Sequence, residues 1–292
     1  MHQPVLIKEI LEMLAPRSSG LYLDGCLGAG GYAEAILEVS GPNGQLLGFD
    51  VDNESIERAE RRLKIFGERF RCWHAGYHES VSILESAGIV KVDGIIIDLG
   101  LSSDQLEDQQ RGFSFKFQGP LDMRFDRSQG KSALDLLHEL SETKLGEIIS
   151  NYGEEPRAIK IAHNLKQAIK NGSLENTEQL CEVIVRSVGR KRGKIHPATR
   201  VFQALRIAVN DELNNLKKGL EELPQFLNTN GRLCIVSYHS LEDRLVKTTF
   251  KEMSRNSYRW RIVTPRPVRP SLEETRSNPR SRSAKLRVIE SL

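Results

Sequence analysis

Glycines and a carboxylate cluster directly after an apolar segment near the N-terminus. Residues 21–32 read Leu-Tyr-Leu-Asp-Gly-Cys-Leu-Gly-Ala-Gly-Gly-Tyr, and a helix-forming segment follows at residues 33–37. A strand, a glycine-rich turn and a helix in this order are typical of α/β domains that bind an adenosine-containing cofactor, because glycine lets the backbone approach the ligand closely. The segment therefore predicts a cofactor site at the turn that includes Gly28, Gly30 and Gly31.

The sequence of this turn is compatible with two kinds of cofactor, a dinucleotide and S-adenosylmethionine. Residues 28–33 satisfy the dinucleotide pattern G-x-G-x-x-A, and Asp50 follows about 20 residues on, where a carboxylate can bind a ribose. Asp24, however, directly precedes the glycines, and a carboxylate repels a pyrophosphate. S-adenosylmethionine has no phosphate and carries an ammonium and a sulfonium, which a carboxylate attracts. The pattern favours S-adenosylmethionine; the alternative for Asp24 is a structural role in capping the turn.

Two further polar residues end strand-like segments, Asp98 after residues 94–97 and His239 after residues 231–238. In doubly wound folds, ligands bind outside the carboxyl ends of the parallel strands. Asp98 is a candidate to accept a proton from a substrate amine, and the alternative is that it only holds the cofactor. His239 is a second candidate for substrate contact, although a single histidine is more often packed than catalytic.

Strand-like segments alternate with helical patterns over the first hundred residues. The segments lie at 21–24, 46–50, 69–74 and 94–98, and runs such as Ile95-Ile96-Ile97 are apolar on both faces, as expected of parallel strands covered by helices. Residues 100–130 are rich in Gly, Ser, Gln and Asp, and residues 132–187 have helical patterns without a convincing strand. Apolar residues at spacings of three and four predict one amphipathic helix over residues 201–223.

The strand pattern returns in the C-terminal part, with predicted strands at residues 231–239, 258–264 and 285–289. Ser240 and Asp243 predict a capping box that opens the helix after the first of these strands. We therefore expect an α/β fold: a doubly wound, Rossmann-like methyltransferase domain formed by residues 1–107 and 205–292. It is split by an inserted all-helical substrate-recognition domain, residues 108–204.

The composition limits the class of protein. The chain has 292 residues, of which 39% are hydrophobic and 28% charged, as in folded globular proteins. There is no apolar run of membrane-spanning length and no signal-peptide pattern, so we expect a cytoplasmic protein with no membrane partner. The four cysteines are scattered, and His74 and His78 lack further ligands nearby, so we expect no metal.

Positive charge is unevenly distributed. The net charge is +3, yet residues 255–287 combine many Lys and Arg residues with only two acids, Glu273 and Glu274, so the rest of the chain is acidic. A second basic cluster comprises Arg186, Arg190, Lys191, Arg192, Lys194 and Arg200. Clustered cations attract nucleic-acid phosphates. The alternative is a solvated surface and a flexible tail.

Several longer sequence segments together carry a specific resemblance to a known family. They are Asp-Leu-Gly-Leu-Ser-Ser-Asp-Gln-Leu at 98–106, Arg-Gly-Phe-Ser-Phe at 111–115, Gly-Pro-Leu-Asp-Met-Arg at 119–124, His-Pro-Ala-Thr-Arg-Val-Phe-Gln-Ala-Leu-Arg-Ile-Ala-Val-Asn-Asp-Glu-Leu at 196–213, Ser-Tyr-His-Ser-Leu-Glu-Asp-Arg at 237–244 and Asn-Pro-Arg-Ser-Arg-Ser-Ala-Lys-Leu-Arg at 278–287. Together they resemble the bacterial ribosomal RNA small subunit methyltransferase H family, also called MraW, over essentially the whole chain. The resemblance implies methyl transfer from S-adenosylmethionine to the N4 amine of a cytidine in the decoding region of 16S rRNA. The implied partner is 16S rRNA within the 30S subunit or a late assembly intermediate; a homodimer remains open.

The resemblance also implies site residues. The cofactor positions of the family fall here on Gly30, Gly31, Tyr32, Asp50, Tyr77, Asp98 and Gln105. The chain departs from the family pattern at Tyr32, Tyr77 and Asp104, where the family usually has His, Phe and Pro.

The rRNA contacts that we expect are Arg111, Phe113, Arg190, Lys191, Arg192, Arg200, Arg280 and Arg282. The aromatic rings of Phe113, Phe115 and Phe117 offer a stacking surface for the target base, and the alternative is that most of them form a small core. A dehydrogenase would explain the glycine turn but not Asp24. A nonenzymatic RNA-binding protein would explain the basic clusters but has no need of the turn.

Overall fold

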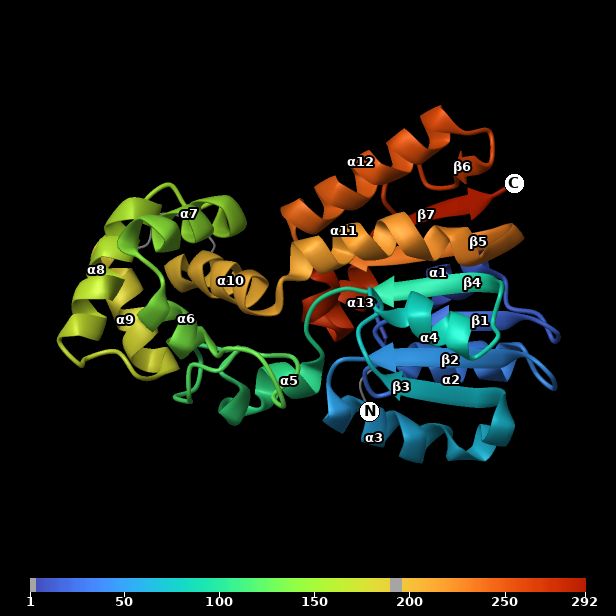
Figure 1. The fold of residues 1–292 in the computed structure, drawn as a ribbon, viewed down its shortest axis with the longest axis horizontal. Coiled ribbons are helices and arrows are strands. Elements are labelled where there is room, and N and C mark those ends of the chain that lie inside the picture. Colours follow the sequence, from blue (N-terminus) through green and yellow to red (C-terminus); the bar gives the residue numbers. More distant parts are fainter. Residues whose placement is uncertain (1–3, 190–195) are drawn as a thin grey trace. The chain divides into compact units, whose positions relative to one another are not determined.

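The computed structural model describes residues 4–189 and 196–292, and the chain divides into two compact units. The first unit comprises residues 1–100 and 213–292, and the second comprises residues 101–212 (Figure 1). Residues 101–107 and 205–212, which the sequence analysis placed with the methyltransferase domain, group here with the second unit.

The first unit is built on a seven-stranded sheet in the order β3-β2-β1-β4-β5-β7-β6. The strands are β1 (Leu21–Asp24), β2 (Gln45–Asp50), β3 (Phe70–His74), β4 (Val92–Asp98), β5 (Leu227–Ser237), β6 (Trp260–Ile262) and β7 (Lys285–Ser291). The first five strands pair in parallel, whereas β7 is antiparallel to both β5 and β6. This topology confirms the expected doubly wound α/β fold.

Helices cover both faces of this sheet. They are α1 (Ile7–Leu14), α2 (Gly31–Val39), α3 (Asn53–Leu63), α4 (Ser80–Ser86), α11 (Glu212–Glu222), α12 (Ser240–Asn256) and α13 (Leu272–Ser277), with 3-10 turns at Lys64–Arg69, Leu223–Phe226 and Pro279–Ser283. Along β4, Ile96 packs into one buried apolar cluster, and Ile95 and Ile97 pack into the other. The strands are therefore apolar on both faces, because each face is covered.

The second unit is helical. Its elements are α5 (Ser103–Glu107), a 3-10 turn at Gln109–Arg111, α6 (Ala133–Glu139), α7 (Glu142–Gly153), α8 (Ala158–Lys170), α9 (Thr177–Val188) and α10 (Pro197–Asn210). Side chains such as Leu145, Ile161 and Leu180 form a core of their own. The described residues of this unit contain no β-strand, only an isolated bridge from Pro120 to Asn176. No helix among the residues that the structure describes is long and apolar enough to cross a membrane.

The predicted single helix over residues 201–223 is wrong. Helix α10 ends at Asn210, and Asp211 adopts a left-handed conformation with φ 49° before α11 begins. The apolar spacing continues through this break, so the periodicity alone does not reveal it. An ion pair of 2.8 Å from Arg206 Nε to Glu212 Oε1 crosses the break.

The predicted capping box of Ser240 and Asp243 is also wrong by one residue. His239 is the N-cap of α12, and its partner in the capping box is Glu242. The carboxylate of Asp243 instead pairs with Lys285 Nζ at 2.8 Å and with Arg287 Nε at 2.7 Å on β7.

Candidate cofactor and active site

Three aspartates end three neighbouring strands of the first unit. Asp24, Asp50 and Asp98 are the last residues of β1, β2 and β4, and β1 pairs with both of the other strands. Because parallel strands end at the same edge of a sheet, the three carboxyl groups gather at the carboxyl edge, where doubly wound folds bind their ligands. The sequence reasoning chose all three residues from their positions at strand ends.

The glycine turn begins after β1 and has the backbone geometry that its composition predicts. Gly28 has φ 52° and Gly30 has φ 80°, in the left-handed region that other residues avoid. A Cβ on Gly30 would lie 3.1 Å from Leu63 Cδ1, so the turn also packs closely on α3. The following residue, Gly31, starts α2.

Asp50, at the end of β2, connects this strand to the glycine turn through hydrogen bonds. Its Oδ2 accepts a hydrogen bond from the backbone N–H of Gly28 at 2.7 Å, and its Oδ1 accepts one from the N–H of Asp52 at 2.9 Å. Burial raises the pKa of Asp50 to about 6, although these two hydrogen bonds favour the ionised form. Asp50 therefore shapes the turn as well as offering a carboxylate to a ligand. Asp52 is the N-cap of α3, where its side chain accepts a hydrogen bond from the N–H of Glu54.

Asp24 is the most deeply buried of the three aspartates. Its Oδ1 accepts a hydrogen bond from the N–H of Cys26 at 3.2 Å, while its Oδ2 has no hydrogen-bond partner in the part of the chain that the structure describes. Burial, together with repulsion from Asp98 and Asp50, raises the pKa of Asp24 to about 8. One oxygen thus caps the turn, and the other is buried without a partner, so that a nearby cation would stabilise the ionised carboxylate.

Asp98 is held by a tyrosine hydroxyl group. The hydroxyl of Tyr238 donates to Asp98 Oδ1 at 2.8 Å. Burial raises the pKa of Asp98 to about 7, and the hydrogen bond from Tyr238 opposes that rise. The hydroxyl of Tyr32 donates instead to the carbonyl oxygen of Val5 at 2.6 Å. Sequence reasoning missed Tyr238, although its place next to the end of β5 could have signalled it.

The charge of this site discriminates between a dinucleotide and S-adenosylmethionine. A pyrophosphate would add negative charge to carboxyl groups that already raise one another's pKa. A ligand with a sulfonium and an ammonium would instead stabilise the ionised carboxylates and could supply the partner that Asp24 Oδ2 lacks. The residues present therefore fit S-adenosylmethionine.

The other predicted cofactor residues lie in different surroundings. Tyr77 packs closely on two glycines of the first unit: a Cβ on Gly25 would lie 2.9 Å from Tyr77 Cβ, and one on Gly219 would lie 2.8 Å from the ring. Gln105 belongs to the second unit, where its Oε1 accepts from the N–H of Ser102 at 3.1 Å in a capping box.

His239 serves as a helix cap in the first unit. Its Nδ1 accepts a hydrogen bond from the N–H of Glu242 at 3.4 Å, and its Nε2 lies 3.1 Å from Glu242 Oε1. Both ring nitrogens therefore lie near Glu242, whose own side chain is buried, although Nε2 makes no hydrogen bond within the described part of the chain.

The structure corrects the expectation that Arg111 and Phe113 contact RNA. Arg111 is 2% exposed, and its guanidinium donates to the carbonyl oxygen atoms of Arg124 and Phe125. Phe113 is 7% exposed in the core of the second unit, 5.6 Å from the ring of Phe125. Both side chains hold the loop before α6 in place. Phe117, by contrast, is 42% exposed.

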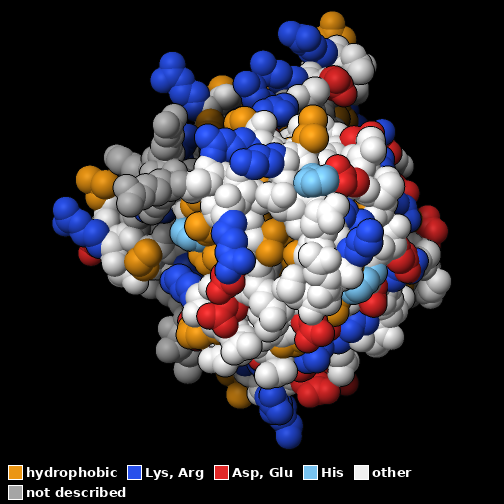
Figure 2. Space-filling model, turned by 90° about the vertical axis from the view of Figure 1, so that its left-hand side faces the viewer, with side chains coloured by type: hydrophobic (Ala, Val, Ile, Leu, Met, Phe, Trp, Pro, Cys, Tyr) orange, Lys and Arg blue, Asp and Glu red, His pale blue; other side chains and the backbone are white. Residues whose placement is uncertain are grey.

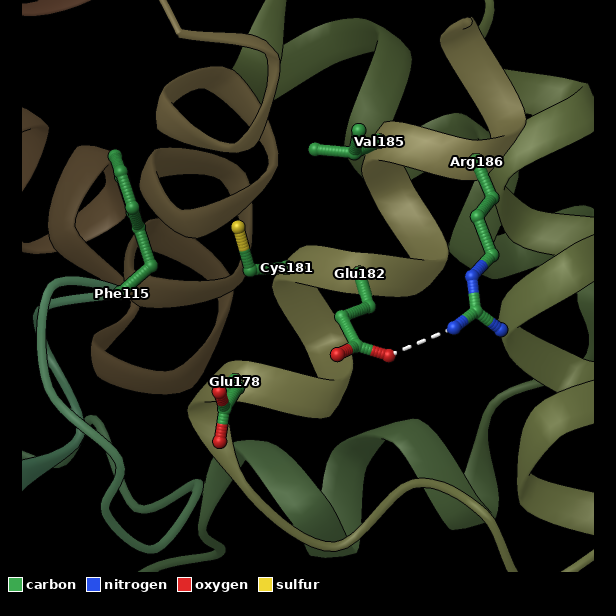
Figure 3. Close-up of a pocket in the computed structure, with 6 residues that line it drawn as sticks. All are labelled: Phe115, Glu178, Cys181, Glu182, Val185 and Arg186. Atoms are coloured by element: carbon green, nitrogen blue, oxygen red, sulfur yellow. Dashed lines mark hydrogen bonds and ion pairs between the residues drawn. The ribbon is translucent and has the colours of Figure 1, made fainter.

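A pocket of about 370 Å³ opens on the second unit. It is lined by Phe115, Glu178, Cys181, Glu182, Val185 and Arg186 (Figure 3). The ring of Phe115 forms one wall and is stacked on His196 at 4.8 Å. The carboxylate of Glu182 is paired with Arg186 at 2.9 Å. The pocket combines an aromatic wall with carboxylates.

The predicted RNA-binding cations fall into two groups. Arg190, Lys191 and Arg192 lie outside the described residues. Arg200 is partly exposed and pairs with Glu155 at 3.3 Å, and Arg282 is exposed in the turn at Pro279–Ser283, which also carries the partly exposed Arg280. The face shown in Figure 2 carries Lys and Arg side chains interspersed with Asp and Glu.

Comparison with known proteins gives full-length matches. The model of the MraW methylase family matches residues 1–292. The chain is 46% identical to ribosomal RNA small subunit methyltransferase H of Thermomicrobium roseum, covering 99% of this chain and 93% of that protein. It is 45% identical to the protein of the same name from Geobacter sulfurreducens, covering 100% of this chain and 99% of the relative. Among solved structures, the crystal structure of PH0851 has a TM-score of 0.50 at 12% identity over 100% of this chain and 46% of that one, a likeness of fold alone.

Proposed function

The chain belongs to the MraW methylase family, and we propose that it methylates the N4 amine of a cytidine in the decoding region of 16S rRNA. S-adenosylmethionine is the methyl donor. The relatives carry small subunit rRNA methylation in their names, and they match this chain over nearly its whole length. The observation that carries the proposal is the carboxyl group of Asp98, which lies at the carboxyl edge of the sheet with a pKa of about 7.

We assign the cofactor to the carboxyl edge around the glycine turn. Bound there, S-adenosylmethionine supplies an electrophilic methyl group on a positively charged sulfur. Asp24 and Asp50 provide negative charge. Gly28 leaves space for close approach of the ligand, because a Cβ there would meet only the carbonyl oxygen of Cys26 at 4.0 Å. Tyr77 offers an aromatic face to the adenine.

Asp98 is the residue that we assign to the substrate amine. The lone pair of an exocyclic cytosine amine is delocalised into the ring, so the amine is a weak nucleophile. A carboxylate that accepts one N–H orients the amine and takes the proton that leaves when the new N–C bond forms. A group with a pKa near 7 is ionised in part at neutral pH and is still basic enough for this task. His239 is the weaker candidate, because both of its ring nitrogens face Glu242.

We assign rRNA recognition to the second unit and to the basic C-terminal stretch of the first. Arg200 and Arg282 reach the surface. Cations of this kind bind nucleic-acid phosphates with an affinity that falls as the salt concentration rises. The target base must leave any helical stack to reach a site at a sheet edge. Residues 101–212 form a unit with its own core, as a separate recognition unit requires.

The test uses 30S subunits from cells that lack this methylation. The subunits are incubated with the protein and methyl-labelled S-adenosylmethionine, and the rRNA nucleosides are identified by mass spectrometry. We expect N4-methylated cytidine with the wild type and at least about a hundredfold slower transfer with Asp98→Asn, since general acid–base catalysis typically contributes that much. Glu85→Gln, which removes an exposed carboxylate from α4, is the matched control. Methylation of a different base would refute the substrate assignment, and full activity of Asp98→Asn would refute the role of Asp98.

A further inference from the structure

Tyr238 is fixed at both ends beside the candidate active site. It directly follows β5, and its backbone N–H donates to Glu242 Oε2 at 2.8 Å. Glu242 is 2% exposed and belongs to the first turn of α12. At its other end the hydroxyl donates to Asp98 Oδ1 at 2.8 Å. The side chain therefore connects the start of α12 to the end of β4.

Gly100 makes room for the tyrosine ring. It has φ +102°, and a Cβ at this position would lie 3.3 Å from Tyr238 Cδ2. The backbone just after β4 thus runs close against the ring. The N–H of Leu99 also donates to the carbonyl oxygen of Val236 at 3.0 Å, which keeps the two strand ends in register. The tyrosine has little freedom to turn away from Asp98.

From this geometry we infer that Tyr238 is a positioning residue for methyl transfer, which orients the Asp98 carboxylate and stabilises its ionised form through the hydroxyl group. The inference rests on the proposed function, in which Asp98 accepts the proton of the substrate amine. A phenol donates one hydrogen bond to a fixed oxygen, so the rest of the carboxylate remains available to the amine. Tyr238 itself touches no reacting atom in this scheme.

The charge balance around Asp98 shows why one hydroxyl matters. Burial and the negative charge of Glu242 disfavour its ionised form. Asp24, whose own pKa is higher, adds repulsion once it ionises. The hydroxyl of Tyr238 favours the ionised form of Asp98, whereas the hydroxyl of Tyr32 donates its hydrogen to the carbonyl oxygen of Val5. Loss of the Tyr238 hydroxyl removes this stabilisation and leaves the effects of burial and of Glu242. The pKa of Asp98 then rises, and less of the enzyme carries the ionised base at neutral pH.

The first experiment measures kcat against pH for wild type and Tyr238→Phe at saturating S-adenosylmethionine. Phenylalanine keeps the ring on Gly100 and removes only the hydroxyl. We expect the acidic limb of the profile to move to higher pH by about one unit, so that the variant is about tenfold slower at pH 6 and within about twofold of wild type at pH 9. Tyr22→Phe is the matched control. Tyr22 is 1% exposed, and its hydroxyl accepts from the N–H of Arg17 in the same unit.

A second measurement does not depend on activity. The carboxyl carbon of Asp98 is followed by NMR titration of aspartate-labelled protein without cofactor, and Asp98→Asn identifies the signal. We expect a higher midpoint in Tyr238→Phe than in wild type and no change in Tyr22→Phe. An unchanged midpoint, or a loss of kcat that is equal at all pH values, would overturn the inference. Wild-type protein that makes no N4-methylcytidine would refute the proposed function, while the titration would still decide whether Tyr238 controls Asp98.

Discussion

Binding of S-adenosylmethionine to this protein should release protons, and Asp24 should supply most of them. The carboxyl groups of Asp24, Asp98 and Asp50 have pKa values of about 8, 7 and 6, all raised by burial. At pH 7 these groups are about nine-tenths, about half and about one-tenth protonated. A ligand with a sulfonium and an ammonium favours the ionised forms, so complete ionisation on binding releases about 1.5 protons at pH 7.

Asp24→Asn removes the largest contribution. The wild-type dissociation constant should fall about thirtyfold from pH 6.5 to pH 7.5, because its logarithm changes with pH by the number of protons released. In Asp24→Asn the release drops to about 0.6 protons and the change to about fourfold. The two proteins should differ most in affinity above pH 8 and converge toward pH 6, where wild-type Asp24 must first lose a proton.

Titration calorimetry in phosphate and in Tris measures this release directly, because the two buffers have different ionisation enthalpies. The α-amino group of the ligand titrates near pH 8, but its contribution is common to both proteins and cancels in their difference. Glu85→Gln, which removes an exposed carboxylate of the same unit, should behave as wild type. A wild-type affinity that is independent of pH, or equal proton release by wild type and Asp24→Asn, would refute the reasoning.

Three further substitutions test the glycine turn of the first unit and the core of the second. Asp50→Ala removes the acceptor of the Gly28 N–H at 2.7 Å, so the affinity for S-adenosylmethionine should fall about tenfold to a hundredfold in calorimetry; an unchanged affinity would contradict the role of this hydrogen bond. Gly30→Ala forces a Cβ into φ 80° and to 3.1 Å from Leu63, and urea denaturation should show a loss of about 1–3 kcal/mol; wild-type stability would argue against the strain. Leu165→Ala opens a cavity in the core of the second unit at a cost of about 2–5 kcal/mol in its unfolding free energy, measured by proteolysis, while cofactor affinity stays within about twofold. A parallel loss of cofactor affinity would show that the two units are not independent in stability.

The strands could be predicted because parallel strands covered on both faces leave uninterrupted apolar runs. Strand β1 begins and ends at the predicted residues, Leu21 and Asp24. The predicted strand at 258–264 shortens to Trp260–Ile262, since an edge strand pairs on one side only and its sequence carries a weaker signal. The prediction of one helix over residues 201–223 was wrong because periodicity indicates only which residues face the core. It does not reveal a single residue in the left-handed conformation, here Asp211.

The site could be predicted only where chemistry coincides with a strand end. Asp24, Asp50 and Asp98 meet this condition. Tyr238 also follows a strand end, but its pairing with Asp98 could not be predicted, because 140 residues separate the two in the sequence and only the folded sheet brings them together. Arg111 was misjudged because a cationic residue suggests an exposed surface, whereas a buried guanidinium can be satisfied by backbone carbonyl groups, as it is here.

The raised pKa values of the three carboxyl groups also bear on the direction of the reaction. In the proposed reaction, methyl transfer would remove the positive charge from the cofactor and release a proton from the substrate amine. With the sulfonium charge gone, the carboxyl groups again repel one another, and the affinity of Asp98 for a proton rises at the moment when the amine gives one up. Loss of charge on the cofactor and uptake of a proton by Asp98 would thus favour each other. An acidic site at neutral pH is therefore consistent with both halves of the proposed reaction, the binding of a cationic donor and the deprotonation of an amine.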